Sequence, residues 1–170
     1  MKKIGFLFSS ILTSLLSISE VVHAQAYSNP YATVSPWAEL PAGRTFGAVG
    51  DTDVDPDGIH IWAVIRCDAT SRDRFGDECM DSNLDSILKF NQAGEVVESF
   101  GGGMFIWPHG IDVDPDGNVW VTDAVNNSRI PAGDARGHLV RKFSPTGKVL
   151  MTLGTPGQEG SGPSHFTSQR

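Results

Sequence analysis

Residues 107–123 read WPHGIDVDPDGNVWVTD and contain the pattern of a complete β-hairpin. Apolar and acidic residues alternate before the turn-forming residues PDGN at 115–118, and a period of two resumes directly after them. This order predicts a strand, a tight turn and a second strand. His109 stands at the entrance of the first strand, where the glycine that follows it would let a ligand approach the backbone closely.

The hairpin pattern occurs twice in the chain. DTDVDPDG at 51–58 corresponds to GIDVDPDG at 110–117, 59 positions later, and each copy is followed by a Lys-Phe pair. The expected strands are 50–55, 59–66, 86–90 and 95–100 in the first copy, and 109–114, 118–123, 138–143 and 148–153 in the second. Four short strands repeated at a period of about fifty residues or more are typical of a β-propeller blade. A β-sandwich is the alternative, but it would not need the repeat.

The sequence therefore predicts an all-β chain with about two four-stranded propeller blades and no helix after the leader. The expected segments are a signal peptide at 1–24, an extended lead-in at 25–46, blade 1 at 47–106, blade 2 at 107–154 and a crossover to a further blade at 155–170. Propellers close with about four to eight blades. We therefore expect the chain to be the N-terminal part of a longer protein, and the alternative is a ring built from several copies.

The first 24 residues have the features of a secretory signal peptide. Lys2 and Lys3 precede an apolar run at 4–16, and Val22-His23-Ala24 fits the small-x-small pattern of a cleavage site. The apolar run is too short to span a bilayer. We expect a secreted or periplasmic protein with no membrane attachment after cleavage.

The mature chain is acidic. The formal charge is −7 at pH 7 for the whole sequence, and removing Lys2, Lys3 and Glu20 with the signal peptide changes it to −8. Nucleic-acid binding depends on a basic surface. We therefore expect no nucleic-acid partner.

Cys67 and Cys79 are the only cysteines, and both lie in the long loop of the first repeat. In an exported protein such a pair is expected to form a disulfide, which contributes about 2 to 3 kcal/mol in the loop-entropy model. A metal site would need further cysteine or histidine ligands at close spacing, and this loop has none.

The two DVDPDG segments also match the first half of an EF-hand calcium loop. The position of the bidentate glutamate, however, is Val64 in the first copy and Asp123 in the second. Asp-Pro-Asp-Gly is also a composition that tight turns use. The sequence therefore favours hairpin turns at both places.

The stretch PHGIDVDPDGNVWVTD, preceded by Phe105 and followed by VRKFSPTGKVLMTLG at 140–154, resembles a blade of the NHL-repeat propellers. Over roughly residues 47–166 the chain resembles, more narrowly, the peptidyl-α-hydroxyglycine α-amidating lyases. The resemblance implies a six-bladed propeller, of which this chain would be about the first third. It also implies a catalytic zinc held by three histidines from different blades and a structural calcium on the central axis.

The resemblance assigns roles to four residues. His109 corresponds to a zinc ligand, and Arg66 corresponds to an active-site arginine beside the substrate. Thr52 and Ile111 correspond to positions whose backbone carbonyls bind the calcium, and the 59-residue offset relates these two positions. The other two zinc histidines and the catalytic tyrosine of the family have no counterpart in this sequence. We therefore expect the chain alone to be inactive as a lyase.

Two classes of function remain open. The first is a zinc-dependent carbon–nitrogen lyase that acts on a small peptide-like carboxylate and releases a peptide amide and glyoxylate. The second is a non-enzymatic exported propeller that binds a peptide, a protein or a glycan. The candidate residues also have structural interpretations, because a lone histidine at a strand entrance commonly only hydrogen-bonds and Arg66 could pair with Asp68. Trp62, Trp107 and Trp120 are expected to pack between blades.

Overall fold

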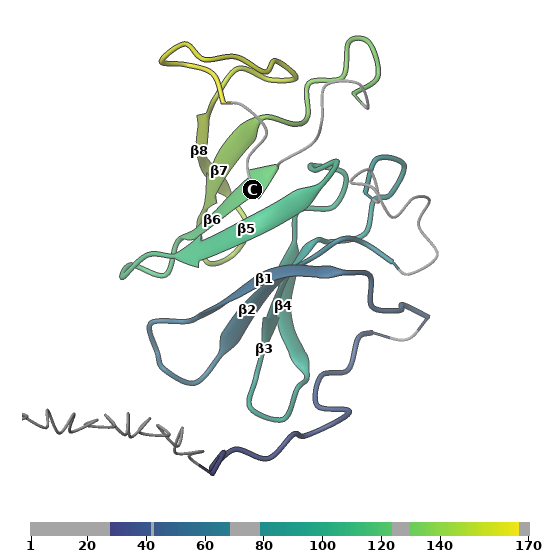
Figure 1. Cartoon of the computed structure of the whole chain (residues 1–170), viewed down its shortest axis with the longest axis vertical. Coiled ribbons are helices and arrows are strands. Elements are labelled where there is room, and N and C mark those ends of the chain that lie inside the picture. Colours follow the sequence, from purple (N-terminus) through teal and green to yellow (C-terminus); the bar gives the residue numbers. More distant parts are fainter. Residues whose placement is uncertain (1–27, 42, 69–78, 124–129, 167–170) are drawn as a thin grey trace, which may run out of the picture. The chain divides into compact units, whose positions relative to one another are not determined.

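Eight strands make up two antiparallel sheets in the computed structural model, which describes residues 28–41, 43–68, 79–123 and 130–166. The strand orders are β1-β2-β3-β4, which we call blade 1, and β5-β6-β7-β8, which we call blade 2 (Figure 1). The strands are β1 Val49–Val54, β2 Ile61–Ile65, β3 Ile87–Phe90, β4 Val96–Phe100, β5 Pro108–Val113, β6 Val119–Asp123, β7 Leu139–Phe143 and β8 Val149–Leu153. The predicted all-β chain of four-stranded blades is confirmed, with every strand end within two residues of its expected position.

The predicted signal peptide lies outside the described residues. Residues 28–33 belong to a separate unit without secondary structure, and the blades belong to the unit that starts at Val34. In the part of the chain that the structure describes, no helix is long and apolar enough to cross a membrane.

The register of the first two strands is the same in both blades. In blade 1 the paired residues are Thr52 with Ala63 and Asp53 with Trp62, and in blade 2 they are Ile111 with Val121 and Asp112 with Trp120. Each first strand also has a register irregularity near its beginning, at equivalent places. The 59-residue offset of the sequence is therefore a structural offset as well.

The DPDG segments are hairpin turns, as predicted. The N–H of Gly58 donates to the carbonyl of Asp55, and that of Gly117 donates to the carbonyl of Asp114, both at 2.8 Å. Each aspartate side chain also accepts the N–H two residues later, at 3.1 Å in both blades. The two glycines have φ values of +69° and +79°, a region that favours glycine. These turns connect strands, so the segments are not helix-flanked calcium loops.

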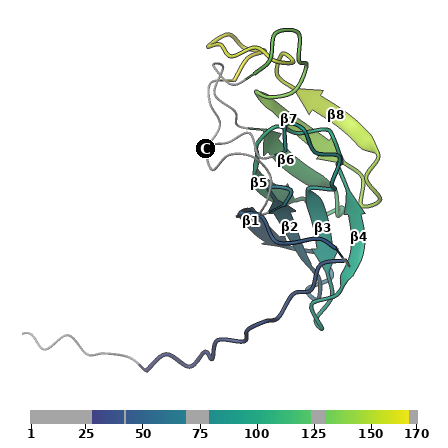
Figure 2. The ribbon, with the colours of Figure 1, turned by 90° about the vertical axis from the view of Figure 1, so that its right-hand side faces the viewer.

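The main hydrophobic core lies between the two blades, which Figure 2 shows as neighbouring sheets. Its buried members are Trp62, Val64, Ile87, Phe100, Phe105, Ile111, Val119, Val121 and Phe143. The Phe100 ring has centroid distances of 5.6 Å to Trp62 and 5.3 Å to Phe143, so it packs against one residue of each blade. Burying a large apolar side chain is worth about 1.5 to 3 kcal/mol. The burial of these side chains is therefore expected to stabilise the contact between the two blades.

The lead-in covers the opposite face of blade 1. Trp37, Ala38 and Leu40 pack against a second core formed by Ala63, Ile65, Leu88 and Phe90. The indole N–H of Trp37 donates to the carbonyl of Gln92 at 3.1 Å, and Glu39 forms an isolated parallel bridge with Glu95. Both faces of blade 1 are therefore packed by other parts of the chain.

Candidate functional site

Arg66, Trp107 and His109 form a cluster where the two blades meet. Arg66 directly follows β2, Trp107 directly precedes β5, and His109 is the second residue of β5. The guanidinium carbon of Arg66 lies 4.6 Å from the centroid of the Trp107 ring. The His109 imidazole meets the same indole edge-on, with a centroid distance of 5.4 Å and an interplanar angle of 61°. The structure therefore brings together the two residues that the sequence assigned to the active site, and Trp107 joins them.

Arg66 is held through its backbone by the start of blade 1. Its N–H donates to the carbonyl of Ala48 at 2.9 Å. Gly47 allows this close approach, because a side chain at that position would collide with the Arg66 carbonyl. A cation stacked on an indole gains further stabilisation from the ring electrons. The guanidinium is therefore positioned by both backbone and side-chain contacts.

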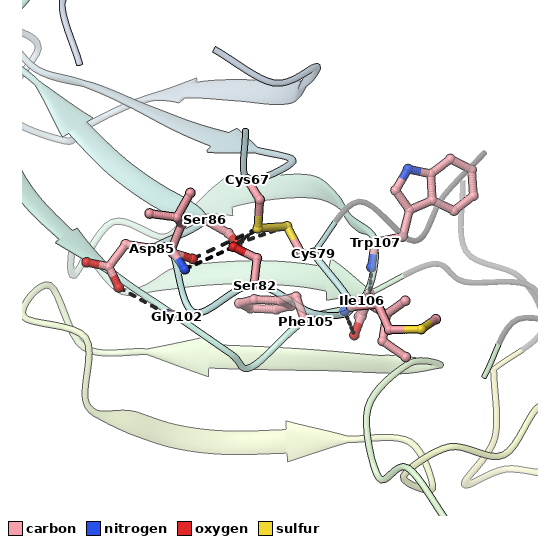
Figure 3. The surroundings of a disulfide bond; sticks show 12 residues. Cys67, Cys79, Ser82, Asp85, Ser86, Gly102, Phe105, Ile106 and Trp107 are labelled. Atoms are coloured by element: carbon pink, nitrogen blue, oxygen red, sulfur yellow. Dashed lines mark hydrogen bonds between the residues drawn. A yellow bond between two sulfur atoms is a disulfide. The ribbon is translucent and has the colours of Figure 1, made fainter. Parts of the chain in front are cut away.

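A disulfide joins Cys67, the residue after Arg66, to Cys79 (Figure 3). Both cysteines are buried, and the Ser86 hydroxyl lies 3.8 Å and 3.6 Å from their sulfurs. The N–H of Cys79 donates to the carbonyl of Ile106 at 3.1 Å, one residue before Trp107. The predicted disulfide is confirmed, and it connects the Arg66 side of the cluster to the Trp107 side.

Asp123 positions Trp107 through its backbone. Its fully buried carboxylate accepts the backbone N–H groups of Trp107 at 2.8 Å, Gly137 at 2.9 Å and Ile106 at 3.1 Å. Burial raises the pKa of Asp123, and the three N–H donors oppose that rise. From the sequence, Asp123 is notable only as the residue that stands where an EF-hand loop needs its bidentate glutamate. The available signal was that an acidic residue ends the apolar strand β6. A carboxylate buried at such a place needs hydrogen-bond donors, so it could have been predicted to bind nearby backbone N–H groups.

His109 lies where β5 passes β1. Gly50 allows the two strands to approach, because a side chain there would lie 2.6 Å from the His109 carbonyl oxygen. Directly beyond this point, the carboxylates of Asp51 and Asp53 accept the N–H groups of Ile111 and Val113 at 3.3 Å and 2.7 Å. The backbone that carries His109 is thus held by contacts between the blades.

The described residues do not by themselves form a zinc site. Within these residues, no group of three or more His, Cys, Asp or Glu side chains could hold a metal ion, whereas a catalytic zinc needs about three protein ligands. The other described histidines have different surroundings. His60 lies before β2 and its ring pairs with Asp57 at 2.6 Å, His138 is buried directly before β7, and His165 lies in the crossover next to Ser164.

Thr52 and Ile111 occupy equivalent positions on the first strands of the two blades. Thr52 is exposed, whereas the Ile111 side chain is buried in the core between the blades. Calcium binds about six to eight oxygen ligands, and backbone carbonyls are among the ligands it accepts. The assignment of these two carbonyls to calcium remains a prediction.

The comparisons with known proteins identify the repeat. Residues 105–130 match the model of the NHL repeat family. The match covers β5 and β6 of blade 2. Its matched region starts at the core residue Phe105, includes Trp107 and His109, and continues through Asp123.

The relatives that this chain resembles include amidating enzymes. The peptidyl-alpha-hydroxyglycine alpha-amidating lyase 1 of Drosophila melanogaster is 40% identical over 81 residues, which are 45% of this chain and 13% of the relative. The peptidylglycine alpha-amidating monooxygenase of Rattus norvegicus is 38% identical over 111 residues, which are 54% of this chain and 10% of the relative. The peptidyl-glycine alpha-amidating monooxygenase of Mus musculus is 36% identical over 85 residues, which are 48% of this chain and 8% of the relative. The resemblance is confirmed for about half of the chain, which spans only a small part of each relative.

Proposed function

We propose that this chain contributes two blades of a propeller that acts as a carbon–nitrogen lyase of the amidating type. The substrate would be a peptide ending in α-hydroxyglycine. Cleavage of the bond between its α-carbon and the amide nitrogen would yield a peptide amide and glyoxylate. The observation that carries the proposal is the convergence of Arg66 and His109 on one indole, in a chain of which about half is similar to amidating enzymes.

Arg66 is the proposed binding residue for the substrate carboxylate. A guanidinium presents two parallel N–H donors that match the two oxygens of a carboxylate. Its packing on Trp107 holds the guanidinium plane in place before a ligand arrives, so less side-chain entropy would be lost on binding. The same positive charge would stabilise the negative charge on the substrate hydroxyl oxygen after its proton is removed and before the carbon–nitrogen bond breaks.

His109 would be one ligand of the zinc in this lyase, and the remaining ligands would have to come from outside the described residues. The carbonyls of Thr52 and Ile111 would be two of the oxygen ligands of a structural calcium. Both metals are inferred from the family resemblance. A disulfide fits an oxidising compartment. We therefore infer that the protein is secreted or periplasmic, with a small peptide-like carboxylate as its partner and neither nucleic acid nor membrane.

Carboxylate binding at Arg66 can be tested on this chain. The full chain is titrated with an acetylated dipeptide ending in α-hydroxyglycine, and the indole N–H signal of Trp107 is followed by NMR. Charge-assisted hydrogen bonds are worth about 1.5 to 3 kcal/mol. We therefore expect Arg66→Gln to weaken binding about tenfold or more. We expect no glyoxylate release from the chain alone.

Two controls make this test specific. Lys148→Gln removes a positive charge from an exposed side chain in blade 2 and should leave binding unchanged. The methyl ester of the same dipeptide lacks the carboxylate and should bind no better to the original chain than the acid binds to Arg66→Gln. Equal binding of acid and ester would refute the carboxylate role, and would favour a propeller that binds peptides without chemistry.

A further inference from the structure

The linker between the blades, residues 101–107, is held by charged side chains of blade 2. Arg141 of β7 donates to the carbonyl of Met104 at 2.7 Å, and its guanidinium carbon lies 5.5 Å from the centroid of the Phe105 ring. The Asp123 carboxylate accepts the next two N–H groups of the linker, at 106 and 107. Four consecutive linker residues therefore each contact a charged side chain of β6 or β7.

Arg136, in the connection between β6 and β7, contacts the linker and blade 1 at the same time. Its Nη1 group donates to the carbonyl of Phe105 in the linker at 3.4 Å and to the carbonyl of Met80 at 2.8 Å. Met80 directly follows the disulfide cysteine Cys79. A single guanidinium thus connects the linker to the disulfide-bonded connection of blade 1, and these two segments lead to the two sides of the candidate site.

Asp134 fixes the orientation of the Arg136 guanidinium. The Nε–H and Nη2–H groups of Arg136 donate to the two carboxylate oxygens of Asp134 at 3.0 Å and 2.6 Å, the fork-shaped pairing that arginine makes with a carboxylate. The Arg136 backbone N–H also donates to this carboxylate, at 2.9 Å. The side-chain hydrogen bonds lower the pKa of Asp134 and raise that of Arg136, so the pair stays ionised near neutral pH. With two of its nitrogens bound to Asp134, the guanidinium directs the third, Nη1, at the two backbone carbonyls.

Gly137, the residue after Arg136, connects this pair to Asp123. Its N–H donates to the Asp123 carboxylate at 2.9 Å, and the same carboxylate accepts the N–H of Trp107 at 2.8 Å. The backbone that carries Arg136 and the backbone that carries Trp107 are therefore bound to one buried carboxylate. A shift of Arg136 acts on Trp107 both through this carboxylate and through the carbonyl of Phe105.

The indole of Trp107 depends on this backbone support, because its own polar group makes no hydrogen bond within the described part of the chain. Its Nε1–H is buried and has no acceptor there. The contacts with Arg66 and His109 involve the ring system and not the N–H group. The position of the ring is therefore set by the backbone of Trp107, which the network around Arg136 holds.

We propose that Arg136 is a positioning residue of the cluster formed by Arg66, Trp107 and His109. It keeps the linker and the disulfide-bonded connection of blade 1 in a fixed relation, so that Trp107 supports the Arg66 guanidinium in the orientation that receives a carboxylate. Arg136 acts through Trp107 and not by contact with the substrate. This role rests on the proposed carboxylate binding by Arg66, whereas its effect on Trp107 is measurable without a ligand.

Hydrogen exchange of the indole N–H groups, followed by NMR, tests the support of Trp107 in the ligand-free full chain. We expect Arg136→Gln to speed the exchange at Trp107 about fivefold or more, because burial is what protects its N–H. Arg136→Lys keeps a donor for the Met80 carbonyl and should restore part of the protection. Exchange at Trp62, which is 0% exposed, is the internal reference and should not change.

Titration with the acetylated dipeptide ending in α-hydroxyglycine, and with its methyl ester, tests the effect on Arg66. We expect Arg136→Gln to weaken binding of the acid about threefold or more, because a misplaced guanidinium meets the carboxylate poorly. Binding of the ester should not change, because the ester lacks the carboxylate that the guanidinium binds. The ratio of acid to ester affinity therefore separates positioning of Arg66 from a general loss of stability.

Lys142→Gln is the matched control in the same blade. The ion pair of Lys142 with Asp114 has a length of 2.8 Å and side chains that are 21% and 19% exposed, and the pair of Arg136 with Asp134 has a length of 2.6 Å and side chains that are 21% and 14% exposed. Asp114 directly follows β5, whereas the cluster lies at the start of that strand. Lys142→Gln should therefore change neither the exchange at Trp107 nor the ratio of acid to ester affinity.

Asp134→Asn guards against an Arg136 variant that fails to fold. It leaves Arg136 in place but weakens its orientation, so it should shift both measurements in the same direction by a smaller amount. Unchanged exchange at Trp107, or an equal acceleration at Trp107 and Trp62 in both variants, would limit Arg136 to general stability and overturn the proposal. If the original chain binds acid and ester equally, the carboxylate role of Arg66 fails, and the exchange at Trp107 alone decides whether Arg136 positions the indole.

Discussion

The two blades contain the same internal triad of an aspartate, a tryptophan and a lysine. In blade 1 the Asp55 carboxylate accepts the indole N–H of Trp62 at 2.8 Å and the Lys89 ammonium at 2.6 Å. The Lys89 ammonium also lies 5.3 Å from the indole centroid, within the range of a cation–π contact. The triad connects the hairpin turn, β2 and β3 of one blade.

Blade 2 repeats the triad with Asp114, Trp120 and Lys142, where the corresponding distances are 3.2 Å, 2.8 Å and 4.8 Å. The difference is burial, because Trp62 is 0% exposed and Trp120 is partly exposed. A blade therefore makes its polar triad from its own repeat, whereas the burial of the tryptophan is provided by the neighbouring blade.

Replacing each tryptophan would separate these two contributions. Both Trp62→Ala and Trp120→Ala remove the indole hydrogen bond and the cation–π contact. Only Trp62→Ala also opens the core between the blades. We expect the free energy of unfolding to fall by about 3 to 5 kcal/mol for Trp62→Ala and by no more than about 2 kcal/mol for Trp120→Ala, measured by urea unfolding. Equal losses would show that the packing of the next blade adds little to the triad.

The second difference between the blades is the disulfide, which only blade 1 contains. Cys67 and Cys79 are 12 positions apart, and closing a loop of that length stabilises the folded state by about 3 kcal/mol in the entropy model. We expect reduction to lower the urea midpoint by a corresponding amount. The double variant Cys67→Ser, Cys79→Ser should unfold at the midpoint of the reduced chain. It should also be insensitive to reductant, and a further loss on adding reductant would contradict the assignment.

Short-range features of this fold could be predicted from the sequence. The hairpin turns follow from Asp-Pro-Asp-Gly, and the strands follow from period-two alternation. The single cysteine pair in the sequence indicated the disulfide. Each of these depends on residues that are close in sequence or that have no alternative partner. They were therefore recoverable without knowing how the blades pack.

Features that depend on the packing of one blade on another were recovered only in part. Trp62 does pack between the blades, but Trp120 is partly exposed, and Trp107 stacks on Arg66 rather than filling a core. Arg66 and His109 entered through the family resemblance. Both side chains contact Trp107 because β1 lies next to β5. This packing of one blade on the other cannot be predicted from the alternation of residues along a strand. The role of Asp123 was missed because its donors come from two separate loops.

The smallest expected effect concerns acid, and it compares the two triads directly. Burial alone would raise the pKa of Asp55, but its bonds to Lys89, a backbone N–H and Trp62 outweigh this and lower the pKa. For Asp114, the bond to Lys142 is the main cause of a lowered pKa. A lowered folded-state pKa contributes stability above the unfolded value of about 3.9, and that stability is lost as the pH falls through the folded-state pKa.

We therefore expect the urea midpoint of the chain to decrease as the pH is lowered below about 4. Asp55→Asn and Asp114→Asn should each make the urea midpoint depend less on pH in this range. Salt should separate the two variants, because screening weakens exposed ion pairs more than buried ones. In about 0.5 M sodium chloride the contribution of Asp114 should shrink more than that of Asp55, which lies beneath the blade-covered Trp62. An equal response to salt would mean that the neighbouring blade shields the indole of the triad but leaves its ion pair as accessible to solvent as in blade 2.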